Sequence, residues 1–153
     1  QGKSVEKTDN YHSLSEEEQK IENLKKVFLM VAGSAFQKYG TALEKNQQTL
    51  LGLSDMMIEV YFAESALLRT LKNTNRGMDT KHQIDMTKLY VFDATETVIS
   101  KSKEIIGNIS EGESMTSLLK SLNRLTRYEN LPDVIGLKKK IADKVILENK
   151  YCF

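Results

Sequence analysis

The sequence is poor in the residues that interrupt or cross-link a chain. Its 153 residues include one proline, one cysteine, eight glycines and no tryptophan. All-β folds turn roughly every 8–12 residues and need glycine and proline at many of those turns. One proline cannot supply them, so the composition predicts few turns and long elements. A chain of this length buries about 70% of its unfolded surface, so it needs neither a disulfide nor a metal to hold a core.

Charge and hydropathy exclude further classes. Lys and Arg number 22 against 21 Asp and Glu, a net charge of +1, whereas nucleic-acid binders usually carry a strong basic surplus. The longest apolar run, Val27 to Gly33, is far short of the roughly 20 residues that span a membrane. The lone Cys152 fits a reducing compartment and no signal peptide is visible, so a cytoplasmic location is expected. The chain begins at Gln1 without a methionine, which suggests an excerpt from a longer protein.

Apolar residues recur at helical spacing and predict an all-α fold, an antiparallel helical bundle of three long and two shorter helices. The long helices are expected at about 13–39, 41–71 and 79–108, and the short ones at about 115–125 and 134–146. Residues 1–12 are polar without an apolar period and predict a flexible tail or linker, which leaves 13–153 as a single helical bundle domain. The predicted joints contain Gly40, Gly77, Gly112 and Pro132.

Some apolar side chains do not fit a single core. The helix expected over 41–71 has an apolar arc about 200° wide, which indicates contact with two or more neighbours. Its periodicity places Met57 on the core stripe and Met56 and Phe62 on an outer face. Outward apolar side chains indicate a surface covered by a partner subunit or by the rest of a larger protein. Glycines inside the helices, such as Gly33 and Gly52, are attributed to close packing.

No catalytic constellation is visible. The two histidines, His12 and His82, lie in the polar tail and at a helix start, and no activated nucleophile accompanies either. The glycines are isolated, so no phosphate-binding loop occurs, and the two Glu-x-x-His pairs of a di-iron bundle are absent. No catalytic, cofactor-binding or metal-binding residue is therefore assigned, and the chain itself is not expected to be catalytic.

Glu64 is a candidate structural acid, because it projects into the apolar arc of its helix. An ionised carboxylate in such a place needs a partner or a raised pKa. The functional interpretation is a general base. A buried acid held by a Lys, Arg or Tyr of another helix is favoured, since no second catalytic group is in view.

A second candidate is a basic contact surface formed by Lys138, Lys139, Lys140 and Lys144 in the last predicted helix. Lysines beside an apolar stripe could meet an anionic membrane or an acidic partner. A solvated helix face explains the same lysines and is favoured, because acidic residues are interspersed with them.

Several short strings resemble one known family. The segment Phe36-Gln37-Lys38-Tyr39-Gly40, followed by Leu43 and Gln47, and the stretch Leu53–Thr70 resemble the extra C-terminal helical region of acyl-CoA dehydrogenases. The longer bacterial members and the very-long-chain type are the most similar. The ending, 141–144 with 148–153, also resembles how those chains finish, so the resemblance covers residues 20–153.

The resemblance implies a non-catalytic module of an enzyme of fatty acid metabolism. Such enzymes introduce an α,β double bond into an acyl-CoA with FAD and a glutamate base, and pass electrons to electron-transfer flavoprotein. Their flavin, acyl-CoA and base lie in preceding domains, and the family's Gly-Gly-Thr or Glu-Gly-Thr string before Asn-Glu-Ile is absent here. FAD is therefore expected in the parent enzyme and not in this chain, and Glu64 is not the family base.

The partners implied are the remainder of the parent enzyme and a second subunit, reached through subunit or interdomain packing. The alternative is a stand-alone helical adaptor that binds a partner helix or an anionic membrane surface, the membrane being the less favoured partner.

Overall fold

A computed structural model describes residues 14–150, and these residues form helices without any strand. The tail predicted at residues 1–12 lies outside this range. The elements in chain order are α2 (Ser15–Tyr39), a short 3₁₀ helix η1 (Gly40–Lys45), α3 (Gln47–Asn75), α4 (Lys81–Ile109), α5 (Gly112–Thr126) and α6 (Val134–Glu148). The predicted all-α bundle of three long and two shorter helices is confirmed.

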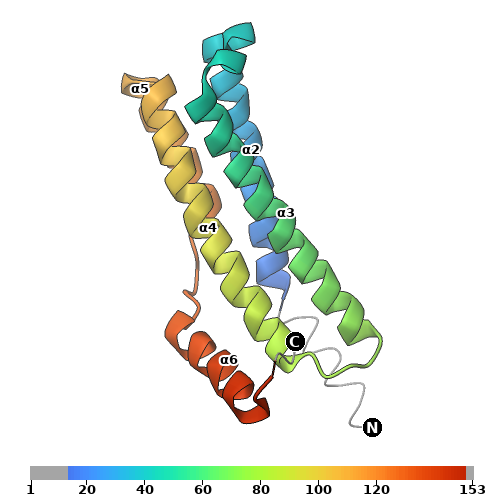
Figure 1. The fold of residues 1–153 in the computed structure, drawn as a ribbon. Coiled ribbons are helices and arrows are strands. Elements are labelled where there is room, and N and C mark those ends of the chain that lie inside the picture. The colour runs from blue at the N-terminus through green and yellow to red at the C-terminus, as the bar shows by residue number, and fades with distance from the viewer. Residues whose placement is uncertain (1–13, 151–153) are drawn as a thin grey trace.

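The long helices run alternately up and down the bundle (Figure 1). Helices α2 and α4 contact each other, and both α3 and α5 pack on this pair. Helix α5 lies along the end of α4 where α4 finishes, and α6 lies near the end where α4 begins (Figure 1). Two short helices thus occupy a position that one long helix would fill in a regular four-helix bundle.

The core forms two clusters along the bundle axis. The larger cluster joins four helices through buried side chains that include Val31, Met56, Ile106 and Leu122. The second cluster, near the starts of α2 and α4, joins three helices and includes Ile21 of α2. Each such aliphatic side chain contributes about 1.5–3 kcal/mol when it is fully buried.

Buried hydroxyl groups link α3 to α4 near the turn between them. The Oγ1 atoms of Thr70 and Thr87 lie 2.9 Å apart, and those of Thr74 and Thr80 lie 2.8 Å apart. All four threonines are buried. Because each hydroxyl has a partner, these polar groups enter the interior without a large desolvation cost.

The second long helix was expected over 41–71, and the structure moves both ends. Its first residues form η1, and α3 begins at Gln47, because the Asn46 side chain accepts a hydrogen bond from the Thr49 amide at 3.2 Å and caps the helix. The helix continues to Asn75 because the buried stripe, which ends in Leu67 and Thr70, is carried beyond Leu71 by Thr74. A search for apolar residues alone cannot follow that stripe.

Two predicted joints have the expected local chemistry. Helix α2 stops at Gly40, whose φ of +52° lies in the left-handed region that glycine adopts without strain. After Pro132, the Asp133 side chain accepts a hydrogen bond from the Gly136 amide at 3.0 Å and caps α6.

Candidate functional site

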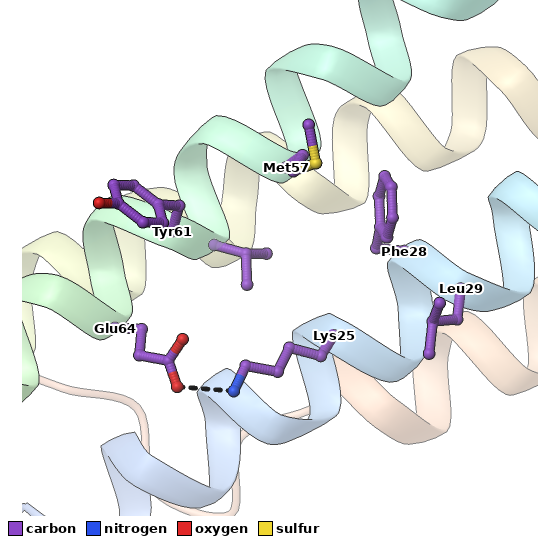
Figure 2. A pocket seen from close by; sticks show the side chains of 7 residues that line it. Lys25, Phe28, Leu29, Met57, Tyr61 and Glu64 are labelled. Carbon is purple, nitrogen blue, oxygen red and sulfur yellow. Dashed lines mark hydrogen bonds and ion pairs between the residues drawn. The ribbon is translucent and has the colours of Figure 1, made fainter.

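A groove of about 280 Å³ lies between α2 and α3 on the outside of the bundle. Lys25, Phe28 and Leu29 line it from α2, and Met57, Val60, Tyr61 and Glu64 line it from α3 (Figure 2). Met57, Tyr61 and Glu64 follow one another at spacings of four and three, which brings them to one side of α3. The groove is apolar along most of its length and charged at one end.

The charged end is built on Lys25. Its Nζ lies 2.6 Å from Oε1 of Glu64 on α3 and 2.8 Å from Oε1 of Glu22 on its own helix. Hydrogen bonds to Glu22 and Glu64 raise the pKa of Lys25 above its ordinary value, so the lysine stays charged at neutral pH. Two carboxylates against one ammonium leave this end with a net charge of −1.

Glu64 is half-buried rather than buried, since 37% of its side chain is exposed. It faces a lysine from another helix, and Lys25 is the one lining residue of the groove that bonds to it. The arrangement therefore joins two helices through one ion pair.

The groove does not fit a flavin. A flavin dinucleotide carries a diphosphate, which requires free cations or backbone amides. The one cation lining this groove is already held by two glutamates. Within residues 14–150, no cluster of three His, Cys, Asp or Glu side chains is arranged to hold a metal ion. Of the two histidines, His82 lies in the first turn of α4, and His12 lies outside the described residues.

The four lysines proposed as a basic contact surface are not equivalent. Lys138, Lys139 and Lys140 are exposed on α6. Lys144 is half-buried, and its Nζ lies 2.5 Å from Oε1 of Glu148, a hydrogen bond that lowers the pKa of that carboxyl. Three of the four lysines are therefore exposed, and Lys144 is partly covered and paired with a carboxylate.

The inward and outward positions on α3 differ from the sequence prediction. Met56 is fully buried and Met57 is 55% exposed, the reverse of what periodicity predicted, whereas Phe62 is exposed as expected. The prediction treated one broad arc as a single face, but the helix has two apolar faces. The signal was present in Asp55 and Glu59, which separate the two faces on one side.

Known acyl-CoA dehydrogenases are similar to this chain in sequence and in fold. Residues 23–124 match the family model described as acyl-CoA dehydrogenase, C-terminal domain. A probable acyl-CoA dehydrogenase of Bacillus subtilis (strain 168) is 33% identical over 140 residues, covering 90% of this chain and 23% of that protein. The crystal structure of an acyl-CoA dehydrogenase from Bacillus anthracis, complexed with FAD, matches with a TM-score of 0.87 and 34% identity over 92% of this chain and 24% of that one.

The chain belongs to the family of the acyl-CoA dehydrogenase C-terminal domain. The resemblance seen in the sequence is thereby confirmed. The chain spans about a quarter of the length of the relatives it matches. Among the helices of residues 14–150, none is long and apolar enough to cross a membrane.

Proposed function

We propose that this chain is the non-catalytic C-terminal helical bundle of an FAD-dependent acyl-CoA dehydrogenase and serves subunit or interdomain packing. The observation that carries the proposal is the exposure of large apolar side chains: Leu29, Tyr61 and Ile146 are 68%, 65% and 75% exposed. Leu29 and Tyr61 line the same groove, and exposed apolar side chains grouped in this way are typical of a region that another protein surface covers. The family membership and the fraction of the relatives' length that matches support the same proposal.

The parent enzyme, in this proposal, dehydrogenates fatty acyl-CoA in the cytoplasm as part of fatty acid metabolism. It holds FAD outside this chain and passes electrons to electron-transfer flavoprotein. Support comes from the relatives, which are described as acyl-CoA dehydrogenases, one of them in complex with FAD. The poor fit of the groove to a flavin agrees with a flavin site elsewhere.

The test uses the purified 153-residue chain and the dehydrogenase lacking it. The chain alone is expected to show no visible flavin absorbance and no acyl-CoA oxidation with an artificial electron acceptor. The truncated enzyme is expected to lose solubility or its native oligomeric state, and adding the chain should restore it. Stoichiometric flavin on the chain alone, or a truncated enzyme with unchanged assembly, contradicts the proposal.

Glu64 has a structural role in this scheme. Its pairing with Lys25 at 2.6 Å supports the interpretation that it fixes the register of α2 against α3. Lys25 is the one groove residue that bonds to Glu64, which favours this role over that of a general base.

A second candidate, an adaptor for an anionic membrane surface, is supported by Lys138, Lys139 and Lys140, which are exposed on the same helix as Ile135 and Ile146. The test is sedimentation with phosphatidylserine vesicles at low salt. Binding should be lost when the three lysines become Gln. A matched control changes three exposed lysines elsewhere, Lys26, Lys38 and Lys45, to Gln and removes the same charge. No binding, or equal loss in both variants, eliminates this candidate.

A further inference from the structure

We infer that the outer face of α3, extended by Leu29 and Phe36 of α2, docks a helix from the flavin-bearing part of the same dehydrogenase. This inference rests on the proposed function and adds to it the surface and its occupant. The outer face is defined by exposed residues of α3: Leu50, Leu51, Ser54, Met57, Ile58, Tyr61, Phe62, Ser65 and Leu68.

Helix α3 is apolar on two nearly opposite sides. Leu53, Met56, Val60, Ala63 and Leu67 are buried toward α2 and α4. At about 100° per residue, the outer face covers an arc of about 140°, and its centre lies about 150° from that of the buried side. No charged residue falls within this arc from Leu50 to Leu68, and the two polar residues in it are small serines. A solvent-facing helix surface normally carries charges, so this face is suited to being covered.

Helix α2 continues the face across the groove. Leu29 shares the groove with Met57 and Tyr61 (Figure 2). Helices α2 and α3 run antiparallel, and Lys25 lies opposite Glu64, so moving forward along α2 to Phe36 corresponds to moving back along α3 toward Leu50 (Figure 1). Phe36 is 63% exposed. The apolar surface therefore runs along both helices away from the charged end.

The exposed apolar residues of α6 form a poorer docking surface. Ile135, Ile146 and Leu147 are highly exposed. On the helical wheel, however, Lys139 lies beside Ile135 and Ile146, and Lys140 lies beside Leu147. Burying this surface would require desolvating these lysines of α6, whereas no lysine lies within the outer face of α3 from Leu50 to Leu68.

The occupant is argued from the size of the relatives and the shape of the face. This fold accounts for 24% of the chain of the solved relative, so most of that polypeptide lies outside the bundle and can cover it. The stretch from Leu50 to Leu68 is about 27 Å long, the length of a helix of about 18 residues. A groove between two helices accepts the side-chain ridge of a third. A free fatty acid is disfavoured, because the glutamates at the charged end oppose a carboxylate.

The experiment is photo-cross-linking in the whole dehydrogenase. A benzoylphenylalanine probe replaces Tyr61 on the outer face of α3, and in a matched variant it replaces Ile146 on α6. Both positions are exposed, so the bundle should fold in each, which circular dichroism verifies. The probe at position 61 is expected to link to a helical peptide of the flavin-bearing part, and the probe at 146 is not. Adding Met57→Glu, which places a charge in the same face, should abolish the link from position 61.

The remaining outcomes overturn the inference in distinguishable ways. A link from 146 to the flavin-bearing part, without one from 61, removes the surface assignment and leaves the proposed function intact. A link from 61 to another copy of the bundle replaces the occupant by a second subunit. No link from either position to the dehydrogenase contradicts both the inference and the interdomain packing proposed above.

Discussion

The Nζ atom of Lys20 lies 3.9 Å from the centre of the Tyr128 ring. The same ammonium donates hydrogen bonds to the backbone oxygens of Thr126 at 3.2 Å and Arg127 at 2.6 Å. The first turns of α2 are thereby tied to the C-terminal end of α5, where backbone carbonyls lack helical partners. Lys20 is 5% exposed, and burial lowers its pKa. This contact anchors the segment that leads into α6.

Replacing Lys20 by Met should destabilise the bundle by about 2 kcal/mol, because two carbonyls lose a charged donor and the ring loses its cation. Met keeps much of the side-chain volume, so lost polar contacts dominate the change. Lys26→Met, on the exposed side of the same helix, is the matched control and should change stability by less than about 0.5 kcal/mol. Urea unfolding measures both variants, and equal effects would refute this role for Lys20.

Replacing Glu17 by Gln should stabilise the bundle to an extent that depends on pH. Burial raises its pKa above the ordinary 4.5, with Lys88 partly opposing the shift, and its Oε2 is buried without a hydrogen-bond partner. The folded state therefore keeps this proton to a higher pH than the unfolded state, and stability is lost as pH rises through the folded pKa. Glu17→Gln removes that loss, so we expect stabilisation by about 0.5 kcal/mol at neutral pH.

The pH dependence separates this effect from simple charge removal. At about pH 4 the advantage of Glu17→Gln should shrink, because the glutamate is then largely protonated in the fold. Glu18→Gln, at an exposed neighbouring position, removes the same attraction to the helix N-terminus and should be slightly destabilising at neutral pH. Denaturation at both pH values tests this, and a gain that is independent of pH contradicts it.

How much the sequence could predict is clearest on α3. The helix itself follows from its apolar spacing. Whether Met56 or Met57 points inward depends on which apolar face of α3 is covered by α2 and α4, and the spacing of apolar residues does not distinguish the two faces. Helical glycines show the same limit. A Cβ on Gly52 would lie 3.1 Å from Cδ1 of Ile105, as close packing predicts, whereas a Cβ on Gly33 would meet nothing within 4 Å.

The candidate site was predictable only in part. Glu64 stood out because it interrupts an apolar arc, and the structure places Lys25 against it. Its partial exposure was not predictable, because the apolar residues around it belong to a solvent-facing surface. The role of Lys20 could not be predicted from the sequence, because its partners are backbone carbonyls more than a hundred residues away along the chain.

The Lys25–Glu64 pair should contribute little to stability despite its short distance. The side chains of Lys25 and Glu64 are 35% and 37% exposed. Ion pairs exposed to this extent contribute about 0.2–1 kcal/mol to stability. A double-mutant cycle with Lys25→Met and Glu64→Gln should give a coupling energy in that range at low salt and a smaller one at about 1 M salt. Because the pKa of Lys25 is raised, the coupling should persist at neutral pH and fall as pH rises through that folded value. A coupling that is insensitive to salt would contradict this interpretation.

Removing the hydroxyl of Thr87 should destabilise the bundle more than removing the hydroxyl of Thr70. Thr87 donates its hydroxyl proton to the backbone oxygen of Gln83 at 2.8 Å, so Thr70 must be the donor in the bond between the two threonines. Thr87→Val leaves the Thr70 hydroxyl buried without an acceptor and should cost about 1–3 kcal/mol. Thr70→Val leaves Thr87 still bonded to Gln83 and should cost about 1 kcal/mol. Chemical denaturation gives the order, and a larger loss for Thr70→Val would reverse this proton assignment.

Gly136 holds the start of α6 by leaving room for its cap. A Cβ at this position would lie 2.2 Å from Oδ2 of Asp133. The same Asp133 side chain accepts a hydrogen bond from the Gly136 amide. Gly136→Ala should therefore break the cap and cost about 1 kcal/mol, although alanine is the better helix former. Gly33→Ala, at a helical position with open space, is the control and should stabilise the bundle by about 0.5–1 kcal/mol. Hydrogen exchange of α6 amides together with urea unfolding checks both, and a stabilising Gly136→Ala would show that α6 does not depend on Asp133.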